Sequence, residues 1–366
     1  MFKYQNQNPN FKNKKQIIYS FCEMPFRHIK INVTGDVTMC CYQGKFLGNI
    51  FKDNIIQIWN NSISKEIREK TLNGELHNNC QEWGGCPYIN KNLKENNQKV
   101  VFLENYPISL EIDLPPTHCN IGGENPNDKN QACVMCPRNF DVFRKSENFK
   151  LNNTKKIIDS IKCIVPNLIL FSVLGVAEPF YKDLIFEIFE EIEFKKYQNN
   201  INFWTYSNGS IFNEILQKKY LEIVKKSFIY FSIDAATKET YKSIRRRDFF
   251  EIIQKNLNLY NKIKGENHRS IMYNNINTLN VKEMEDMVVF AKDNNFNEIQ
   301  FNPTHDCGSL TSEKTIQDIM VTKDNVSVFL ENSEKAKEKA KEINMPIKMV
   351  REFEQVVGND LIQLTI

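Results

Sequence analysis

The sequence predicts an α/β protein built on a parallel sheet, with a small cysteine-rich segment before it. From residue 100 onward, short β-branched or aromatic runs alternate with longer helical patterns. Such a repeated strand-helix order implies parallel strands joined by right-handed crossovers. The first 90 residues instead contain Cys22, Cys40, Cys41, Cys80 and Cys86. Because 366 residues exceed what one ordinary core fills, we expect a large domain and a smaller module.

Each element of the large domain is predicted from its local pattern. The six candidate strands are runs of β-branched and aromatic residues at 108–114, 168–174, 201–206, 228–234, 270–274 and 298–302. The segments between and after them have helical periodicity, at 153–163, 181–193, 212–225, 238–264, 281–294 and 325–343. Cys163 falls on the apolar side of its predicted helix, which favours a place in the core.

A loop with three cysteines follows the first predicted strand. Cys119, Cys133 and Cys136 are spaced C-x13-C-x2-C, which becomes C-x3-C-x2-C when residues 122–131 are set aside. Those ten residues, GGENPNDKNQ, are turn formers and polar residues, so they predict a surface excursion whose ends lie close together. Loop closure costs grow slowly with length. Three thiols this close can hold three irons of a four-iron cluster and leave the fourth iron open to a non-protein ligand.

Two other interpretations of this loop stay open. Cys133 and Cys136 could bind a structural zinc ion together with Cys119 or His118, or all three thiols could be reduced core residues. The cluster is favoured because the loop offers three thiols and no fourth partner.

The loop resembles the signature loop of the radical S-adenosylmethionine (SAM) superfamily. The resemblance is carried by Cys119, Asn120, Cys133, Met135, Cys136, Pro137 and Arg138. It implies that the three thiolates bind a 4Fe-4S cluster whose open iron chelates the amino and carboxyl groups of SAM. Reductive cleavage of SAM would then give a 5′-deoxyadenosyl radical that abstracts hydrogen from a substrate. It also implies a partial (β/α)6 TIM-like barrel, in which functional residues gather at the C-terminal ends of the strands.

Later strand ends continue the resemblance in the family's order. The segment Gly175-Val-Ala-Glu178-Pro is similar to the family's G-x-G-E-P, with Ala177 in place of a glycine, and Ser-Asn208-Gly is similar to its T-N-G turn. The resemblance implies SAM contacts by the following residues: Glu178 for the amino group, Ser232 and Asp234 for the ribose, Arg245 for the carboxylate, and Gly175 and Asn208 as the remaining cofactor-binding positions. Helix N-caps, a tight turn and a solvated basic run at 245–247 are the structural alternatives.

The N-terminal segment resembles the SPASM domain, an auxiliary iron-sulfur module of radical SAM enzymes. The likeness rests on the cysteines and on Gly48-Asn49, Ile58-Trp59-Asn60 and Arg68 between them. It implies a second 4Fe-4S cluster, bound by Cys22, Cys40, Cys80 and Cys86 with Cys41 as a substitute or spare. Four cysteines also suit tetrahedral zinc, which stays open here.

We expect an N-terminal tail at 1–16, the SPASM-like domain at 17–92, the barrel at 93–310 and a helical extension at 311–366. Cys307, in His-Asp-Cys-Gly after the sixth strand, is a candidate catalytic residue that could donate a hydrogen atom, ligate a metal or be a bystander. His28 and His77 lie off the positions that match the family, which favours the surface.

Composition narrows the class of protein. Because 48 basic and 45 acidic residues give a net charge of only +3, a nucleic-acid partner is not indicated. No run predicts a membrane span or a signal peptide, so we expect metal-binding thiols in a reducing cytoplasm.

The sequence therefore predicts a cytoplasmic radical SAM enzyme that takes electrons from a donor such as flavodoxin or ferredoxin. Its expected substrate is a peptide or protein side chain, which it would oxidise, crosslink or epimerise. A carbohydrate dehydrogenase or epimerase is the alternative enzyme, and a non-catalytic metal-binding scaffold is the alternative from a different class.

Overall fold

The structure is a computed structural model that describes residues 16–19, 22–41, 45–75, 77–78, 99–102, 105–122, 132–136, 152–304, 318–322 and 324–349. Three of the predicted site residues, Cys80, Cys86 and Cys307, lie outside the described residues. Residues 123–131 of the predicted excursion also lie outside them.

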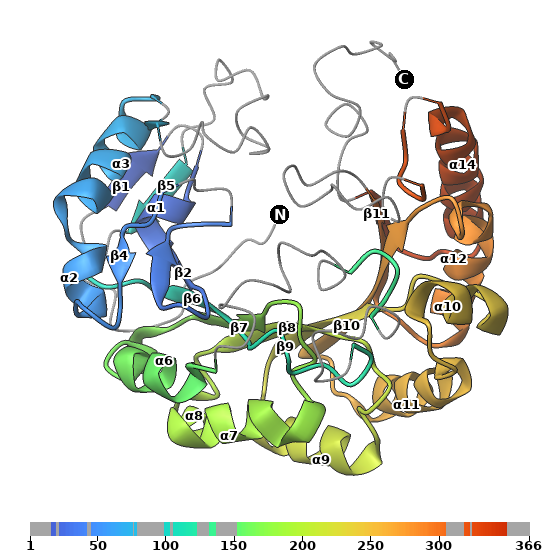
Figure 1. Ribbon diagram of the computed structural model, residues 1–366, viewed down its shortest axis with the longest axis horizontal. Helices are drawn as coiled ribbons and strands as arrows, with labels where there is room; N and C mark the ends of the chain where they lie inside the picture. Colours follow the sequence, from blue (N-terminus) through green and yellow to red (C-terminus); the bar gives the residue numbers. More distant parts are fainter. Residues whose placement is uncertain are drawn as a thin grey trace.

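A curved sheet with helices on its outer side dominates the structure (Figure 1). The six predicted strands pair in parallel and in chain order, as β6 (Ser109–Asp113), β7 (Leu170–Leu174), β8 (Asn202–Ser207), β9 (Ser227–Ser232), β10 (His268–Ile276) and β11 (Glu298–Pro303). The strand β12 (Ile347–Met349) adds a further parallel strand beside β11. The predicted partial barrel is confirmed, and all six strands begin and end within two residues of their predicted bounds.

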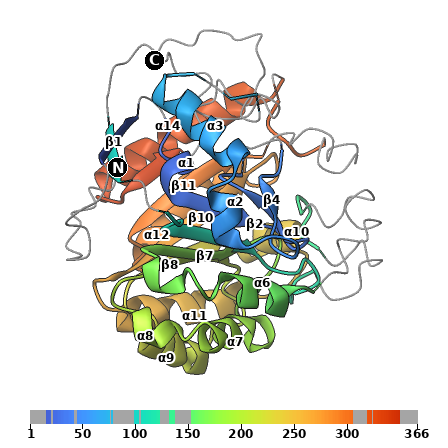
Figure 2. The same cartoon turned by 90° about the vertical axis from the view of Figure 1, so that its left-hand side faces the viewer.

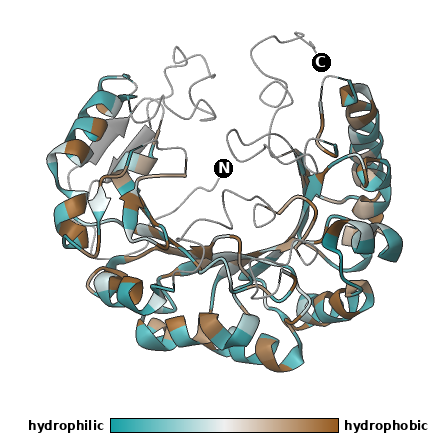
Figure 3. Cartoon of the chain, viewed as in Figure 1, coloured by the Kyte–Doolittle hydropathy of each residue, from teal (hydrophilic) through white to brown (hydrophobic). Residues whose placement is uncertain are grey.

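The two faces of the sheet differ because side chains alternate along each strand. The convex face carries buried apolar residues such as Leu110, Phe171, Phe203 and Phe231, which pack against the helices. Burying each such side chain contributes about 1.5–3 kcal/mol. Figure 3 shows this distribution, with hydrophilic residues on the outer sides of the helices. The concave face is polar and aromatic, and this face carries the site.

The helices that follow the strands cover the convex face (Figures 1 and 2). They are α6 (Thr154–Ile161), α7 (Leu184–Glu191), α8 (Phe194–Tyr197), α9 (Glu214–Ile223), α10 (Lys238–Arg245), α11 (Phe250–Ile263), α12 (Met284–Asp293) and α14 (Val326–Glu342), with short 3-10 turns η4 (Val165–Asn167), η5 (Tyr181–Asp183) and η6 (Val281–Glu283). None of the described helices combines the length and apolar character needed to cross a membrane.

Two predictions about the helices are wrong. The single helix expected at 238–264 is two helices, because Arg246 adopts a left-handed conformation with φ of 56° and ends α10. Cys163 is exposed and not in the core, because α6 ends at Ile161 before reaching it.

The N-terminal segment extends the sheet of the barrel. Strand β2 (His28–Ile31) pairs in parallel with β6, and β3 (Asp36–Thr38) and β4 (Gly48–Asn49) continue the sheet as antiparallel strands. The helices α1 (Met24–Arg27), α2 (Ile55–Trp59) and α3 (Ser62–Leu72) accompany them, and β1 (Gln16–Tyr19) pairs with β5 (Lys99–Phe102) in a separate two-stranded sheet. The strand that leads to the three-cysteine loop is therefore hydrogen-bonded to a strand of the cysteine-rich segment.

The motif residues of this segment make structural contacts. Asn49 donates its side-chain amide to the carbonyl of Thr34 at 2.9 Å and to Asp36 at 2.8 Å. The Arg68 guanidinium lies 4.1 Å from the centre of the Trp59 ring, and its Nη2 donates to the Trp59 carbonyl at 2.8 Å. These residues hold the turn between β2 and β3 and the contact between α2 and α3, so their role is to shape the segment.

Candidate functional site

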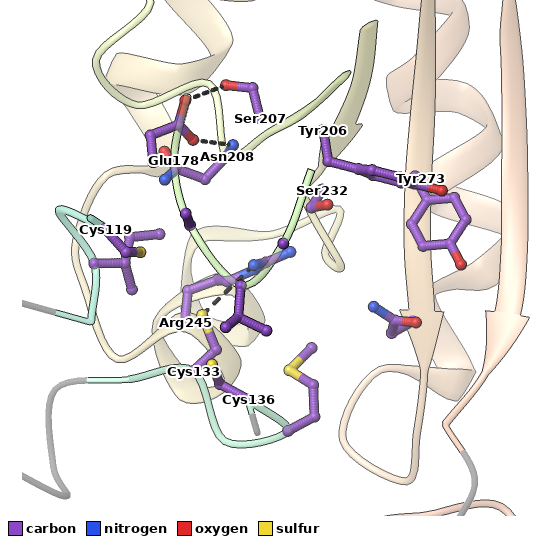
Figure 4. Close-up of a pocket in the computed structure, with 16 residues that line it drawn as sticks. Cys119, Cys133, Cys136, Glu178, Tyr206, Ser207, Asn208, Ser232, Arg245 and Tyr273 are labelled. Carbon is purple, nitrogen blue, oxygen red and sulfur yellow. Dashed lines mark hydrogen bonds between the residues drawn. The ribbon is translucent and has the colours of Figure 1, made fainter. Parts of the chain in front are cut away.

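A cavity of 270 Å³ lies at the C-terminal ends of β7 to β10, beside the three-cysteine loop; we call it the upper cavity (Figure 4). All three cysteines of the loop line it together with residues from four strand ends. The lining residues are Cys119, Ile121, Cys133, Met135, Cys136, Gly175, Val176, Ala177, Glu178, Tyr206, Ser207, Asn208, Ser232, Arg245, Tyr273 and Asn275. The structure thus brings together five of the six predicted SAM-contact positions with the three thiols.

Backbone contacts fix the two halves of the cysteine loop. The amide of Gly122 donates to Cys119 Sγ at 3.4 Å, and the amide of Cys136 donates to the Cys133 carbonyl at 2.9 Å. The Val134 amide donates to the Ile244 carbonyl at 2.9 Å, which attaches the second half to α10. Among the described residues, no three histidine, cysteine or acidic side chains are grouped closely enough to hold a single metal ion. In a four-iron cluster, each thiolate binds a different iron.

Asparagine side chains connect the first half of the loop to the end of β8. Asn208 donates its side-chain amide to Asn120 at 2.9 Å, and Asn120 donates to the Ser210 hydroxyl at 2.8 Å. Because Asn120 follows Cys119 directly, these bonds position Cys119 on the wall of the upper cavity. Asn208 therefore has a positioning contact in addition to its predicted contact with SAM.

Glu178 is buried on the wall of the upper cavity and faces three donors. Its carboxylate accepts hydrogen bonds from the Asn208 amide at 2.6 Å, the Ser207 hydroxyl at 2.9 Å and the Phe180 amide at 3.3 Å. Burial nevertheless raises the pKa of Glu178 to about 7, because the hydrogen bonds and the more distant Arg245 offset the loss of hydration only in part. The group is a carboxylate whose charge a cation in the cavity would stabilise.

Gly175 allows β7 to approach the strand that leads to the cysteine loop. Its φ is 101°, and a Cβ atom at this position would lie 3.2 Å from the backbone N and O of Leu114. Only glycine adopts this conformation without strain and also fits the space. The neighbouring Ala177 also lines the cavity, so the alanine that replaces a family glycine is accommodated.

Arg245 extends from the last turn of α10 into the wall of the upper cavity. Its Nη1 donates to Cys133 Sγ at 3.5 Å (Figure 4), and its Nη2 lies 2.5 Å from Asp234 Oδ2. Burial alone would lower the pKa of Arg245, but the Asp234 carboxylate and the Cys133 thiol raise it, so the guanidinium stays charged. Asp234 itself is fully buried and does not line the cavity. Its predicted contact with SAM ribose remains a prediction.

A second cavity of 380 Å³, the lower cavity, lies on the concave face toward the N-terminal ends of the strands. It lies between the barrel strands and the cysteine-rich segment. Its lining residues are Glu23, Met24, Arg27, His28, Cys40, Cys41, Ser109, Glu111, Leu170, Trp204, Phe228 and Tyr230. Cys40 and Cys41 are thus placed at this cavity, whereas Cys22, which is also described, lines neither cavity.

Lys30 of β2 forms ion pairs with two carboxylates of β6, of which Glu111 lines the lower cavity. Lys30 Nζ donates to Glu111 and, at 2.9 Å, to Asp113 Oδ1. Burial alone would lower the pKa of Lys30, but these two carboxylates raise it. His28, predicted at the surface, is buried, and burial lowers its pKa to about 3, so it is neutral and bonded to Ser109 at 2.8 Å.

An aromatic cluster separates the two cavities. The Tyr206 ring lies 4.9 Å from that of Tyr230 and 5.3 Å from that of Tyr273, and the Trp204 ring lies 5.8 Å from both Tyr206 and Tyr230. Tyr206 and Tyr273 line the upper cavity, whereas Trp204 and Tyr230 line the lower one.

The aromatic cluster and the charged residues of β2 and β6 were not predicted from the sequence. A signal for them was present, because Ser109, Glu111 and Asp113 alternate with apolar residues, and Trp204 and Tyr206 lie two positions apart in their strand. Period-two alternation places such residues on one face of a strand.

Comparison with family models now identifies the class of protein. A model described as the radical SAM superfamily matches residues 130–291, and the SPASM model, described as an iron-sulfur cluster-binding domain, matches residues 22–87. Residues 130–291 therefore form a radical SAM domain, and residues 22–87 form an N-terminal SPASM segment. The expected cofactors are thereby confirmed as a 4Fe-4S cluster with SAM at the barrel and an auxiliary iron-sulfur cluster. The barrel match begins after Cys119 and includes Cys133 and Cys136.

Similar solved structures include the following three. SuiB from Streptococcus suis is 13% identical at a TM-score of 0.46, covering 67% of this chain and 49% of its own. The protein anSMEcpe with bound AdoMet is 17% identical at 0.48, covering 66% of this chain and 64% of its own. A radical SAM methyltransferase from Sphaerobacter thermophilus is 11% identical at 0.44, covering 68% of each chain. The chain thus spans about half the length of the SuiB structure that it matches. No curated protein matches it.

Proposed function

We propose that this chain is an enzyme that cleaves SAM reductively at a 4Fe-4S cluster on Cys119, Cys133 and Cys136, and that it abstracts a hydrogen atom from a peptide or protein side chain. The bound cluster and SAM supply the 5′-deoxyadenosyl radical for this step. The observation that carries the proposal is the upper cavity, because all three cysteines line it together with Glu178 and Arg245. We place the activity in the cytoplasm, with flavodoxin or ferredoxin as the electron donor.

The donors and acceptors around the upper cavity fit this pair of cofactors. On the cysteine side, the Gly122 amide and the Arg245 guanidinium direct N–H groups at sulfur atoms, as the thiolates of a cluster require. Away from Cys133 and Cys136, a buried carboxylate is available at Glu178 (Figure 4). The cavity is close to the lower end of the range for ligand sites, about 300–1,000 Å³.

Glu178 is the proposed acceptor for the amino group of SAM. Ser207 and the Asn208 amide hold its carboxylate in a fixed orientation, so an ammonium group meets an acceptor that needs no reorganisation. An ammonium group would also stabilise the ionised form that burial disfavours. Ser232 and Asn208, on the same wall, are the proposed polar contacts to the rest of SAM.

The lower cavity is the proposed space for the substrate. It adjoins the upper cavity across the tyrosine cluster, and Cys40 and Cys41 line its other side. A substrate held there would lie between the upper cavity and the auxiliary cluster proposed for Cys22, Cys40, Cys80 and Cys86, and its reacting carbon would have to extend past the tyrosine cluster to meet the radical in the upper cavity. Its aromatic wall and polar groups suit an amphipathic side chain.

Substrate class is the finer part of the proposal. A peptide or protein side chain is favoured over a carbohydrate because the wall of the lower cavity includes Trp204, Phe228 and Tyr230, which bury apolar surface well. The carbohydrate dehydrogenase or epimerase remains the runner-up, since sugars also stack on aromatic rings. A precursor peptide encoded beside this chain is the substrate to test first, with mass spectrometry of the treated peptide as the measurement.

Release of 5′-deoxyadenosine distinguishes a SAM-cleaving enzyme from a non-catalytic metal-binding scaffold. Anaerobically reconstituted protein, reduced with dithionite and given SAM, should release it slowly without substrate. Cys133→Ala should abolish the release, whereas Cys163→Ala should retain it because Cys163 is an exposed cysteine away from both cavities. Binding of SAM without cleavage, at full cluster occupancy, would favour the non-catalytic scaffold.

A further inference from the structure

We propose that Arg245 and Asp234 form a buried charge pair that sets the reduction potential of the catalytic cluster through Cys133. In this role Arg245 acts on the cluster through its contact with Cys133. The Asp234 carboxylate partly offsets the positive charge of Arg245 and so weakens its electrostatic effect on the cluster. The inference rests on the proposed function, since it takes Cys133 as a cluster ligand. It differs from the role expected for Arg245, which was a direct contact with the SAM carboxylate.

The geometry of Arg245 supports this role. The guanidinium is buried between one thiol and one carboxylate, with Nη1 at 3.5 Å from Cys133 Sγ and Nη2 at 2.5 Å from Asp234 Oδ2. Nη1 thus donates to the thiol, whereas Nη2 forms an ion pair with Asp234 Oδ2 without the geometry of a hydrogen bond; Nε and Nη2 are buried without a hydrogen-bond partner among the described residues. The buried ion pair with Asp234 keeps the guanidinium beside Cys133.

Asp234 is held in place independently of Arg245. Its φ is 63°, a left-handed conformation that a non-glycine residue adopts only where its surroundings require it. The Asn275 amide donates to Asp234 Oδ1 at 2.7 Å, and the Asn280 side chain donates to the Asp234 carbonyl at 2.9 Å. The other oxygen, Oδ2, is therefore left to face Arg245. The buried pair after the end of β9 is therefore held in one geometry, whereas an exposed ion pair would be free to rearrange.

The physical effect follows from the charge of the cluster. Reduction adds one electron, so a nearby positive charge and an N–H donor to a thiolate stabilise the reduced state and raise the potential. The Asp234 carboxylate offsets part of that positive charge. Because both groups are buried, water screens their fields weakly. Removing the arginine should therefore lower the potential, and removing the carboxylate should raise it.

The test measures the midpoint potential of the catalytic cluster by electron paramagnetic resonance, without SAM, in protein that keeps an intact cluster. Arg245→Met should shift it to a more negative value, and Asp234→Asn to a more positive one. A shift of about 59 mV corresponds to a tenfold change in a one-electron equilibrium, and each variant should reach this order. Because either variant leaves a buried partner unpaired, the double variant D234N/R245Q, in which both charges are neutralised, is measured with them.

Arg269 and Glu298 provide the matched control, since they form an ion pair at 3.3 Å on the same sheet but do not line the upper cavity. Arg269→Met should leave the potential unchanged. The proposal is overturned if the cluster assembles in R245M and D234N with an unchanged potential, or with shifts of the same sign. A loss of SAM affinity in R245M at constant potential would restore the carboxylate-binding role. If the wild-type protein binds no cluster at Cys133, the proposed function itself fails.

Discussion

At the scale of single residues, Glu178 shows how burial prepares a group for a ligand. Its carboxylate has three donors and still has a pKa of about 7, because the loss of hydration outweighs the hydrogen bonds. An Asp or Glu in this state destabilises the ligand-free protein whenever it is ionised. A positively charged ligand then recovers part of that free energy on binding, which favours a cation in the upper cavity.

The linkage gives a prediction for the ligand-free protein. Since the pKa of Glu178 is raised above its unfolded value of 4.5, the folded state binds more protons than the unfolded state between pH 4.5 and 7. This group alone makes the free energy of unfolding fall by on the order of 3 kcal/mol as pH rises through this window. Glu178→Gln removes that contribution, so the free energy of unfolding, measured with urea, should change in a more positive direction from pH 5 to pH 8 in the variant than in the wild type.

The test rests on the difference between the wild type and Glu178→Gln in how the free energy of unfolding changes with pH. Burial lowers the pKa of His28 to about 3 and that of His268 to about 4, so these residues make stability rise with pH between those values and 6.5. Their contribution is the same in wild type and in E178Q. Equal pH dependence in the two proteins would show that Glu178 does not titrate in this range.

The site residues could be predicted from the sequence where they belong to a motif. Their hydrogen-bond and ion-pair partners could not. Spacing and order placed Glu178, Asn208 and Arg245 at strand ends, and all three line one cavity. The pairing of Arg245 with Asp234 depends on the left-handed backbone at Asp234, for which no local sequence signal exists in a non-glycine residue.

At the scale of elements, the strands were predicted from local pattern because each is a short run bounded by polar turns. Helix boundaries were less predictable. The break at Arg246 is not marked by a glycine or a proline. The hydrophobic periodicity of the sequence therefore predicted one continuous helix across it. This break matters for the site, because it places Arg245 in the last turn of α10, opposite the cysteine loop.

The cysteine loop gives an element-scale prediction. If residues 122–131 are an excursion, deleting them should bring Cys119 to four positions before Cys133 without loss of the cluster. The Ala132 amide can then take the place of the Gly122 amide that donates to Cys119 Sγ. Iron content and 5′-deoxyadenosine release should be retained, and the stability cost should be small because turn formers and polar residues offer little to pack.

A variant with ten Gly and Ser residues in place of 122–131 is the matched control for length. Coupled product formation could fall in both variants, since Ile121 and Cys133, which lie on either side of the excursion in the sequence, line the upper cavity. Loss of the cluster in the deletion but not in the Gly-Ser variant would mean that the length of the excursion positions Cys119. That result would refute the closed-up spacing.

At the scale of the whole molecule, one sheet connects the cysteine-rich segment with the strand that leads to the three-cysteine loop. The pairing of His28 with Ser109 joins strands that are 81 residues apart in the chain. Such pairing has no local signature, because any strand with an apolar face could occupy that edge. The sequence therefore predicted a separate small module, and the continuation of the barrel sheet by β2 to β4 was not predicted.

Metal content tests the two-site organisation. Anaerobic reconstitution should give about eight irons per chain, four for each cluster. Replacing Cys119, Cys133 and Cys136 together with alanine should remove about half the iron and leave the N-terminal cluster. If elemental analysis found stoichiometric zinc in the remaining site, the N-terminal site would be a structural zinc site and not an auxiliary iron-sulfur cluster. The assignment of the barrel would be unaffected.

The ladder between β2 and β6 also fixes the spacing of the two proposed metal sites. Residues 28–31 pair directly with residues 109–112, and the second strand of this pair leads into the loop of Cys119. A flexible tether would let such sites drift by several ångströms, whereas a hydrogen-bonded ladder moves as one body. Any electron that passes between the two sites would therefore cross a gap of constant width. Its transfer rate would depend on driving force and hardly on the motion of one segment relative to the other.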